Sequence, residues 1–204
     1  MQIALIVLGY LVGSIPFAVP VVRLLHGKDV RHTGSGNVGA RNSLRVGGKK
    51  AGILVLILDA LKSALPMLLA KLLTNNLWTV ALVGAAAITG HCFSWYLIWR
   101  SLRMTWHGWR VALVRWGGQG LASALGVIAV LAPLLILPVL GLGIAINFGL
   151  KRSTLAATTM IVVAPILAAW RGYEPAVWTG FAISAVVIGI KLLQDIPPGV
   201  SEPM

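Results

Sequence analysis

The sequence predicts an all-α, polytopic integral membrane protein with about seven transmembrane helices. Of its 204 residues, 58% are apolar and only 11% are charged, whereas soluble domains carry about 25% charged residues. Long apolar runs recur along the chain, and the alternation typical of β-strands does not persist. The net charge of +12 would suit a nucleic-acid-binding protein. Repeated apolar runs exclude that class, and they also exclude a disordered basic tail.

The apolar runs define the expected helices in order. Because about 20 helical residues span a bilayer, residues 121–150 are too many for one helix, and Pro133 predicts a break near residues 132–133. Each other run predicts one helix, with an interruption at Gly90–His91 in the third run. The first run is expected to be a retained membrane helix rather than a signal peptide. Residues 1–204 thus form a single membrane domain with helices within residues 2–25, 51–73, 77–99, 121–150, 154–170 and 176–193.

Positive charge alternates between successive connections. Basic residues crowd the connections at about residues 26–50, 91–120 and 150–154, whereas residues 74–76, 132–133 and 171–174 carry no net charge. The positive-inside rule then places the three basic loops and the C-terminus in the cytoplasm, and the N-terminus outside. An even number of helices would break this alternation, so the charge pattern also supports seven.

The first basic loop has the composition of a phosphate site. Its G-S-G-N-V-G run, residues 34–39, matches the dinucleotide-binding pattern, but a membrane helix and not a strand precedes it, which argues against a dinucleotide fold. Glycines let backbone N–H groups approach an anion closely, and arginine forks suit phosphate. A basic loop that only contacts lipid headgroups is the alternative. The expected phosphate-binding residues are Gly34, Ser35, Gly36, Asn37, Gly39, Arg41, Asn42 and Arg45.

Among the ionisable residues of the apolar runs, three are candidates for the site or for an ion pair. Asp59 and Lys62 are three residues apart and share one helical face, so we favour an internal structural ion pair. In another interpretation, Asp59 orients an arginine of the first loop. His91 is expected to emerge beside the basic loops, where it is the best side-chain base. Cys92 is the only cysteine, which excludes an intramolecular disulfide and a thiolate metal cluster.

The second and third basic loops contain further candidates. A stripe of five tryptophans is flanked by Arg103 and Arg110, a pattern typical of a helix in the headgroup plane. Glycines after this stripe predict a second anion-binding turn. A third site would lie at the start of the sixth run, where a helix N-terminus favours anions, although membrane anchors and an N-cap explain the same residues. The residues concerned are Trp95, Trp99, Trp106, Trp109 and Trp116, then Gly117, Gly118, Gln119 and Gly120, and finally Lys151, Arg152 and Ser153.

Six strings in the chain resemble one family of membrane enzymes, the bacterial acyl-phosphate:glycerol-3-phosphate acyltransferases. They occur in family order over most of the chain: GSIPFA (13–18), GSGNVGARNSLRVGG (34–48), DALKSALP (59–66), GHCF (90–93), GGQGLASALGV (117–127) and KRSTLAAT (151–158). The resemblance implies a seven-helix enzyme of the bacterial inner membrane, with its active site facing the cytoplasm. Such enzymes move a fatty acyl group from acyl phosphate to glycerol 3-phosphate and so produce lysophosphatidic acid.

The resemblance also implies partners and site residues. The expected partners are acyl phosphate, glycerol 3-phosphate and membrane lipids, without nucleic acid, coenzyme A, a metal or another cofactor. Residues that match the family's motifs are Ser35, Asn37, Asn42 and Arg45 in the phosphate loop, His91 in the second motif and Ser153 in the third. Of these, Ser35, Arg45 and His91 are the expected catalytic residues.

The chain departs from the family at three places. Gln119 stands where the family has a lysine, residues 95–116 form an apparent Trp/Arg-rich insertion, and no histidine follows His107. These departures motivate a second hypothesis, a diverged paralogue that binds phospholipid or lipid phosphate without turnover. A third hypothesis is a small transporter for an anionic substrate, against which the absence of a visible sequence repeat argues.

Overall fold

The computed structural model describes residues 1–104, 117–151 and 153–194, and these are helices joined by short connections, without a strand. Five described segments are long and apolar enough to cross a membrane, namely Gln2–His26, Ala40–Leu73, Leu77–Trp99, Pro133–Leu150 and Pro175–Leu193. Two shorter apolar helices, Leu121–Leu131 and Leu155–Trp170, complete the set of seven apolar segments. The all-helical membrane fold is therefore confirmed, whereas the number of spans and the sides of the termini stay predictions.

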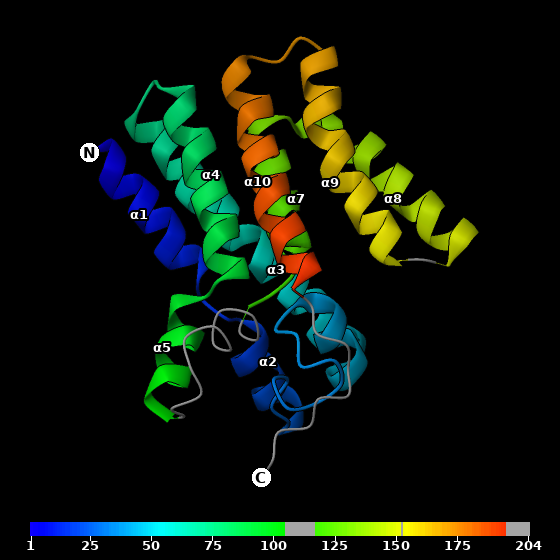
Figure 1. Ribbon diagram of the computed structural model, residues 1–204. Helices are drawn as coiled ribbons and strands as arrows, with labels where there is room; N and C mark the ends of the chain where they lie inside the picture. The colour runs from blue at the N-terminus through cyan, green and yellow to red at the C-terminus, as the bar shows by residue number, and fades with distance from the viewer. Residues whose placement is uncertain (105–116, 152, 195–204) are drawn as a thin grey trace.

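The helices follow one another in the order that the apolar runs predict, with additional short helices between them. Figure 1 shows this arrangement. The described elements are α1 (Gln2–Gly13), α2 (Ala18–His26), α3 (Ala40–Leu73), α4 (Leu77–Cys92), α5 (Trp95–Met104), α7 (Leu121–Leu131), the 3-10 turn η1 (Pro133–Leu135), α8 (Ile136–Leu150), α9 (Ser153–Trp170) and α10 (Pro175–Leu193).

The connections lie at two opposite ends of the bundle. In Figure 1, the N-terminus and the connections at residues 74–76 and 171–174 lie at the upper end. The loop at residues 27–39, the first turns of α3, and α5 lie at the lower end. The weakly charged and the basic connections are thus separated in space, as the alternation along the sequence predicts.

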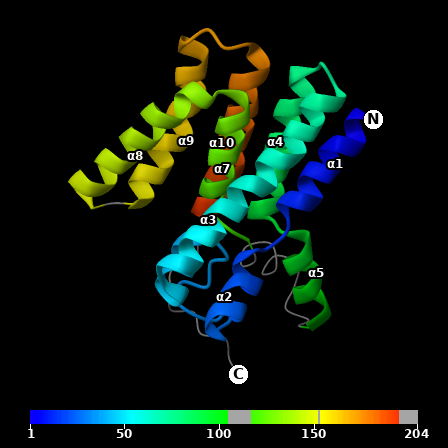
Figure 2. The same ribbon diagram turned by 180° about the vertical axis from the view of Figure 1, so that it is seen from behind.

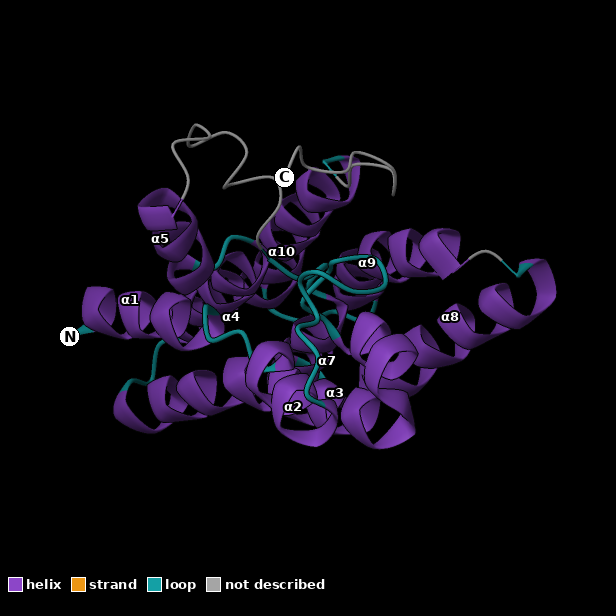
Figure 3. Cartoon of the chain, turned by 90° about the horizontal axis from the view of Figure 1, so that it is seen from below, coloured by secondary structure: helices purple, strands orange, loops and turns teal. Residues whose placement is uncertain are grey.

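The core forms where α3, α4, α7 and α10 meet. Helix α4 packs against α1, α3, α7 and α10, and buried side chains such as Val83, Ile88, Val127 and Ile188 join these helices. Figure 2 shows α1, α3 and α4 side by side from behind, and Figure 3 shows α8 and α9 on the side away from α1 and α5. Large apolar side chains such as Phe148 remain exposed on the outer helix faces, as a lipid-facing surface requires.

The first apolar run is broken, which corrects the single helix expected over residues 2–25. Helix α1 ends at Gly13, and α2 begins only at Ala18. Pro16 lies in the break, and the residue before a proline disfavours helical backbone. Ser94 Oγ donates a hydrogen bond to the carbonyl of Ser14, which ties the break to the turn between α4 and α5. Helix α2 then packs against α3.

Helix α3 begins eleven residues earlier than the expected start at residue 51, and this corrects the assignment of residues 40–50 to a loop. Its first turns carry Arg41 and Arg45, whose charges conceal a helix from an analysis based on apolar runs. The backbone leaves the helical conformation at Gly48, with φ 70° and ψ −174°. Only glycine adopts this conformation readily, so Gly48 joins a basic helical segment to the membrane segment.

The two remaining breaks lie close to their expected places. Helix α4 ends at Cys92, and Phe93 and Ser94 separate it from α5, so the break falls just after the expected Gly90–His91 pair. The split within residues 121–150 is confirmed, because α7 ends at Leu131 and Ala132 is non-helical before η1. Pro133 explains this split, since proline disfavours continuation of a helix.

Candidate active site

A polar cavity of about 360 Å³ lies where the first loop meets α3, α4 and α7. These elements converge at the lower end of the bundle in Figure 1. Segments far apart in the sequence contribute to the cavity, so the fold brings the first-loop candidates together with His91 and Gln119. The residues that line it are Ser35, Asn37, Gly39, Ala40, Arg41, Asn42, Arg45, Leu56, Asp59, His91, Gln119, Gly120, Leu121 and Ala122.

Asn42 organises the glycine-rich loop. Its Oδ1 accepts a hydrogen bond from the backbone N–H of Ser35 at 2.9 Å. Its Nδ2 lies 3.0 Å from each of the carbonyl oxygens of Val30, Thr33 and Asn37, to which it donates. The amide is buried and engaged by four backbone groups, so Asn42 shapes the loop from within. This role differs from the direct phosphate contact expected for its side chain.

The loop can close around Asn42 because of Gly34. The backbone of Gly34 is left-handed, with φ +66°, and a Cβ at this position would collide with Oδ1 of Asn42. Gly36 is left-handed as well, with φ +73°. Both positions favour glycine over any residue with a side chain. The loop thus keeps its backbone close to the cavity that Ser35 and Asn37 line.

Arg41 and Arg45 lie one helical turn apart at the start of α3, and both line the cavity. Both side chains are exposed, so they can meet a ligand that arrives from water. The first turn of a helix carries unpaired N–H groups and a partial positive charge that favours anions. The two guanidinium groups add forked donors suited to phosphate oxygens. This side of the cavity therefore has the chemistry of an anion site.

His91 is buried against the glycine turn that precedes α7. The backbone N–H of Gly118 donates to the carbonyl of His91 at 3.0 Å. A Cβ on Gly117 would collide with the Cys92 carbonyl, and a Cβ on Gly118 would collide with Nε2 of His91. Gly117 and Gly118 therefore allow close packing on His91, while Gln119 and Gly120 line the cavity. Only the second half of the expected anion-binding turn faces the site.

Asp59 and Lys62 form an ion pair inside the bundle, with 2.8 Å between Lys62 Nζ and Asp59 Oδ1. Lys62 Nζ also donates to the carbonyl of Ile15 at 2.8 Å and lies 5.9 Å from the centre of the Phe17 ring. Asp59 Oδ1 is 3.6 Å from Nδ1 of His91. The carboxylate thus lies between a lysine and the histidine that lines the cavity.

A family model supplies the deciding comparison. The model described as glycerol-3-phosphate acyltransferase matches residues 3–197 of this chain. The chain belongs to the glycerol-3-phosphate acyltransferase family. Two curated relatives carry the same name: a protein of Anaeromyxobacter dehalogenans (strain 2CP-C) is 40% identical over 90% of this chain and 86% of its own. A protein of Myxococcus xanthus (strain DK1622) is 49% identical over 65% of this chain and 62% of its own.

Solved structures of PlsY, an integral membrane glycerol 3-phosphate acyltransferase, share the fold. Its glycerol 3-phosphate form superposes on this chain with a TM-score of 0.78 at 30% sequence identity, covering 93% of this chain and 87% of PlsY. Its lysophosphatidic acid form gives a TM-score of 0.77 with the same identity and coverage. The expected membership of this family is therefore confirmed over nearly the whole chain.

Some residues expected at the site of this acyltransferase-family protein are not brought to the cavity. Lys151 is exposed at the connection between α8 and α9 and does not line the cavity. Arg152 and the side chain of Ser153 lie outside the described residues. In α5, the rings of Trp95 and Trp99 stack with 5.6 Å between centroids. The rest of the expected stripe, Trp106, Trp109, Trp116 and Arg110, and the side chain of Arg103, also lie outside the described residues.

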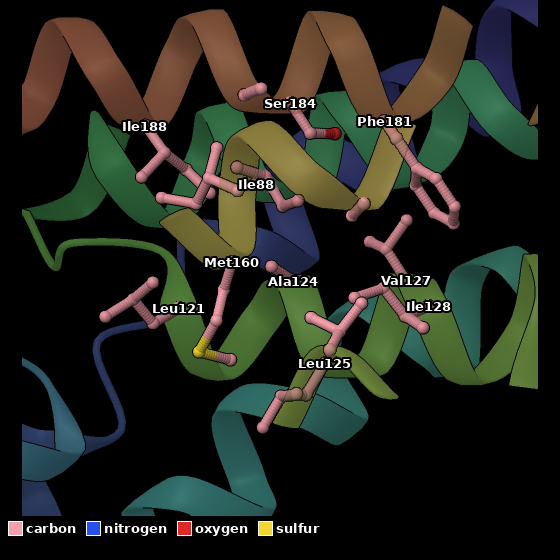
Figure 4. Close-up of a pocket in the computed structure, with 14 residues that line it drawn as sticks. Ile88, Leu121, Ala124, Leu125, Val127, Ile128, Met160, Phe181, Ser184 and Ile188 are labelled. Atoms are coloured by element: carbon pink, nitrogen blue, oxygen red, sulfur yellow. The ribbon is translucent and has the colours of Figure 1, made fainter. Parts of the chain in front are cut away.

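An apolar crevice adjoins the polar cavity. It has a volume of about 30 Å³ and lies between α4, α7, α8, α9 and α10. Figure 4 shows its lining, including Ile88, Leu125, Met160 and Phe181. Leu121 lines both this crevice and the polar cavity. In this acyltransferase-family protein, one side chain therefore borders both an apolar and a polar compartment.

Three charged residues make contacts that were not predicted from the sequence. Arg31 and Asp29 form an ion pair with 2.6 Å between Arg31 Nη2 and Asp29 Oδ2, and this guanidinium holds the pKa of the carboxyl well below its usual range. The only acid in the first basic loop was a signal for this pair. Lys191 is buried, with Nζ 5.4 Å from the centre of the Phe93 ring. Its place near the end of an apolar run predicts an interfacial anchor, so no local signal indicated burial.

Proposed function

We propose that this protein transfers the acyl group of an acyl phosphate to the 1-hydroxyl of glycerol 3-phosphate. The hydroxyl oxygen bonds to the acyl carbon, the bond from that carbon to the phosphate oxygen breaks, and lysophosphatidic acid and phosphate leave. The observation that carries the proposal is the cavity that joins Ser35 and Arg45 to His91. The names of the relatives support glycerol 3-phosphate as the acceptor. We place the reaction at the cytoplasmic face of a bacterial inner membrane.

In this mechanism, the substrates' phosphates bind among cations and backbone donors. Arg41 and Arg45 neutralise phosphate charge, and the loop around Ser35 contributes N–H groups and a hydroxyl. An acyl phosphate is already activated, so neither a nucleophilic side chain nor a cofactor is required. Orientation of the two substrates and stabilisation of developing charge supply most of the rate.

His91 takes the proton of the attacking hydroxyl in this proposal. It is the histidine that lines the cavity among the described residues, and an imidazole can accept a proton near neutral pH. An oxygen of the acyl phosphate is the alternative acceptor. The acyl chain extends past Leu121 into the apolar crevice, and because that crevice is narrow, Leu121 and Met160 must move to admit it.

A direct assay tests the proposed reaction. Purified protein in detergent is incubated with palmitoyl phosphate and glycerol 3-phosphate, and lysophosphatidic acid is measured by mass spectrometry. We expect steady product formation from palmitoyl phosphate and none from palmitoyl-coenzyme A in a parallel reaction. Product from the thioester alone would contradict the donor, and binding of glycerol 3-phosphate without product from either donor would contradict the activity.

A second candidate function rests on Gln119. The glutamine lines the cavity at the position where the resemblance leads us to expect a lysine, and a missing charged contact costs about 1.5–3 kcal/mol. A paralogue that binds lipid phosphate without turnover would have this deficit. We expect Gln119→Lys to change kcat/KM of an active parent by less than about tenfold. An inactive parent that gains activity with Gln119→Lys would instead favour the binding paralogue.

A further inference from the structure

We infer that Asp59 is a positioning residue that orients His91, and that Lys62 holds Asp59 for this task. The inference deepens the proposed function and rests on it, because it assigns a use to the imidazole in acyl transfer. The sequence favours an internal structural ion pair of Asp59 and Lys62, with orientation of a first-loop arginine by Asp59 as the other interpretation. Their contacts with the cavity wall indicate an additional role.

Lys62 is fixed from several sides. Its Nζ contacts Asp59 Oδ1 and the Ile15 carbonyl, each at 2.8 Å, and faces the Phe17 ring. Ile15 and Phe17 lie in the break between α1 and α2. The ammonium is therefore anchored to backbone outside its own helix. A lysine held in this way restrains the carboxylate that it contacts.

Asp59 contacts Lys62 and also faces the cavity. Asp59 is one of the residues that line the cavity, and its Oδ1 is 3.6 Å from Nδ1 of His91. Oδ1 of Asp59 is engaged by Lys62, whereas Oδ2 of Asp59 and Nδ1 of His91 make no hydrogen bond to the described residues, and all three atoms are buried. The separation is longer than a hydrogen bond. Such contacts at a catalytic base are often long without substrate and shorten in the complex.

The carboxylate selects one form of the imidazole. An acceptor at Nδ1 favours the tautomer that carries its hydrogen on Nδ1, which leaves Nε2 as the basic nitrogen. On the opposite side of the ring, Nε2 lies against Gly118, where a Cβ would overlap it. The backbone N–H of Gly118 also binds the carbonyl of His91. Asp59 and Gly118 together therefore fix both the tautomer and the orientation of the ring.

The double variant Asp59→Asn/Lys62→Met separates the two roles. Removing both charges leaves no unpaired ion inside the bundle, so the variant should fold. If the ion pair has only a structural role, the variant should also keep its activity. We expect the variant to fold and its kcat for acyl transfer to fall about 100-fold, because the base is misplaced. The KM for glycerol 3-phosphate should stay within about threefold of the parent. Adding His91→Ala to the double variant should lower kcat only slightly further, because the double variant has already removed the function of His91.

A spectroscopic measurement makes the test independent of turnover. In protein labelled with ¹⁵N-histidine, we expect His91 of the unmodified chain to carry its proton on Nδ1, and the double variant to lose this preference. The control Ser63→Ala removes a hydrogen bond to the Ser123 carbonyl close to Lys62, and it should change neither the tautomer nor kcat.

Each result has a definite meaning. An Nε2–H tautomer in the unmodified chain overturns the inference, even if the variant does not fold. Parental kcat in a folded Asp59→Asn/Lys62→Met variant also overturns it and leaves the proposed function intact. Absence of acyl transfer in the unmodified chain would refute the proposed function instead. The tautomer measurement alone would then test whether Asp59 orients His91.

Discussion

Replacing Arg45 by alanine is expected to lower kcat/KM for acyl transfer by about 100-fold to 1,000-fold, the loss typical of removing one preorganised donor from an anionic transition state. Arg45 lines the cavity from the second turn of α3. Its guanidinium can bind two phosphate oxygens at once, which alanine cannot replace. Initial rates with palmitoyl phosphate over a range of glycerol 3-phosphate concentrations measure the loss.

Lys49→Met is the matched control for Arg45→Ala. Lys49 is exposed four residues after Arg45, just beyond the non-helical Gly48, and does not line the cavity. The control removes the same unit of charge from the same helix, so it should keep kcat/KM within about threefold of the parent. Equal losses in both variants would mean that net charge, and not a contact in the cavity, is responsible. Parental kcat/KM in Arg45→Ala would remove Arg45 from the proposed site.

Asn42→Ala is expected to lower activity strongly, because the glycine-rich loop loses the side chain that holds its shape. The substitution leaves the N–H of Ser35 and three carbonyls without their partner. The hydrogen bond to the Val30 carbonyl is buried, and a buried group left unpaired costs about 1–3 kcal/mol. The glycine-rich loop should then lose its shape, and kcat/KM should fall by at least about 100-fold because the phosphate donors are no longer placed. Trypsin cleavage at Lys28 and Arg31 should become faster while the helical content remains.

Two further variants define the role of Asn42. Asn42→Asp keeps an acceptor for Ser35 but places a carboxylate oxygen against three carbonyls, so we expect a loss similar to that of alanine. Asn75→Ala changes an exposed asparagine in the connection at residues 74–76 and should leave activity and cleavage unchanged. This connection lies at the opposite end of the bundle in Figure 1. If Asn42→Ala only raised the KM for glycerol 3-phosphate and left trypsin cleavage unchanged, Asn42 would be a direct ligand and not the organiser of the loop.

The membrane helices were predictable from sequence because the bilayer imposes their length and hydropathy. The split between α7 and α8 follows from Pro133 and from the length of the apolar stretch. The early start of α3 and the break after α1 were not predictable in this way. The charges of Arg41 and Arg45 hide the first turns of α3 from an analysis of apolar runs. Pro16 is a local signal for the break after α1, but the hydrogen bond from Ser94 that ties this break to the turn between α4 and α5 is not. Such contacts leave no periodic signal.

The residue types of the candidate site were predictable, but their individual contacts were not. Glycines and arginines in one loop indicate phosphate chemistry, and the structure brings them to the same cavity as His91. The use of Asn42 inside the loop depends on four backbone groups whose positions emerge only on folding. The burial of Lys191 depends on the packing of α10 near Phe93. These features come from tertiary structure and have no local pattern.

The conformation of Gly48 has a consequence for the rotational phase of α3. Its backbone, with φ 70° and ψ −174°, interrupts the helical twist. The face that Asn42 and Arg45 present to the cavity is therefore independent of the face that Asp59 presents to His91. The segment before Gly48 can thus face the polar cavity while the segment after it packs in the core of the bundle, and no single helical register has to suit both. The helical periodicity of apolar residues in the membrane segment of α3 therefore begins after Gly48 and need not continue that of the basic segment before it.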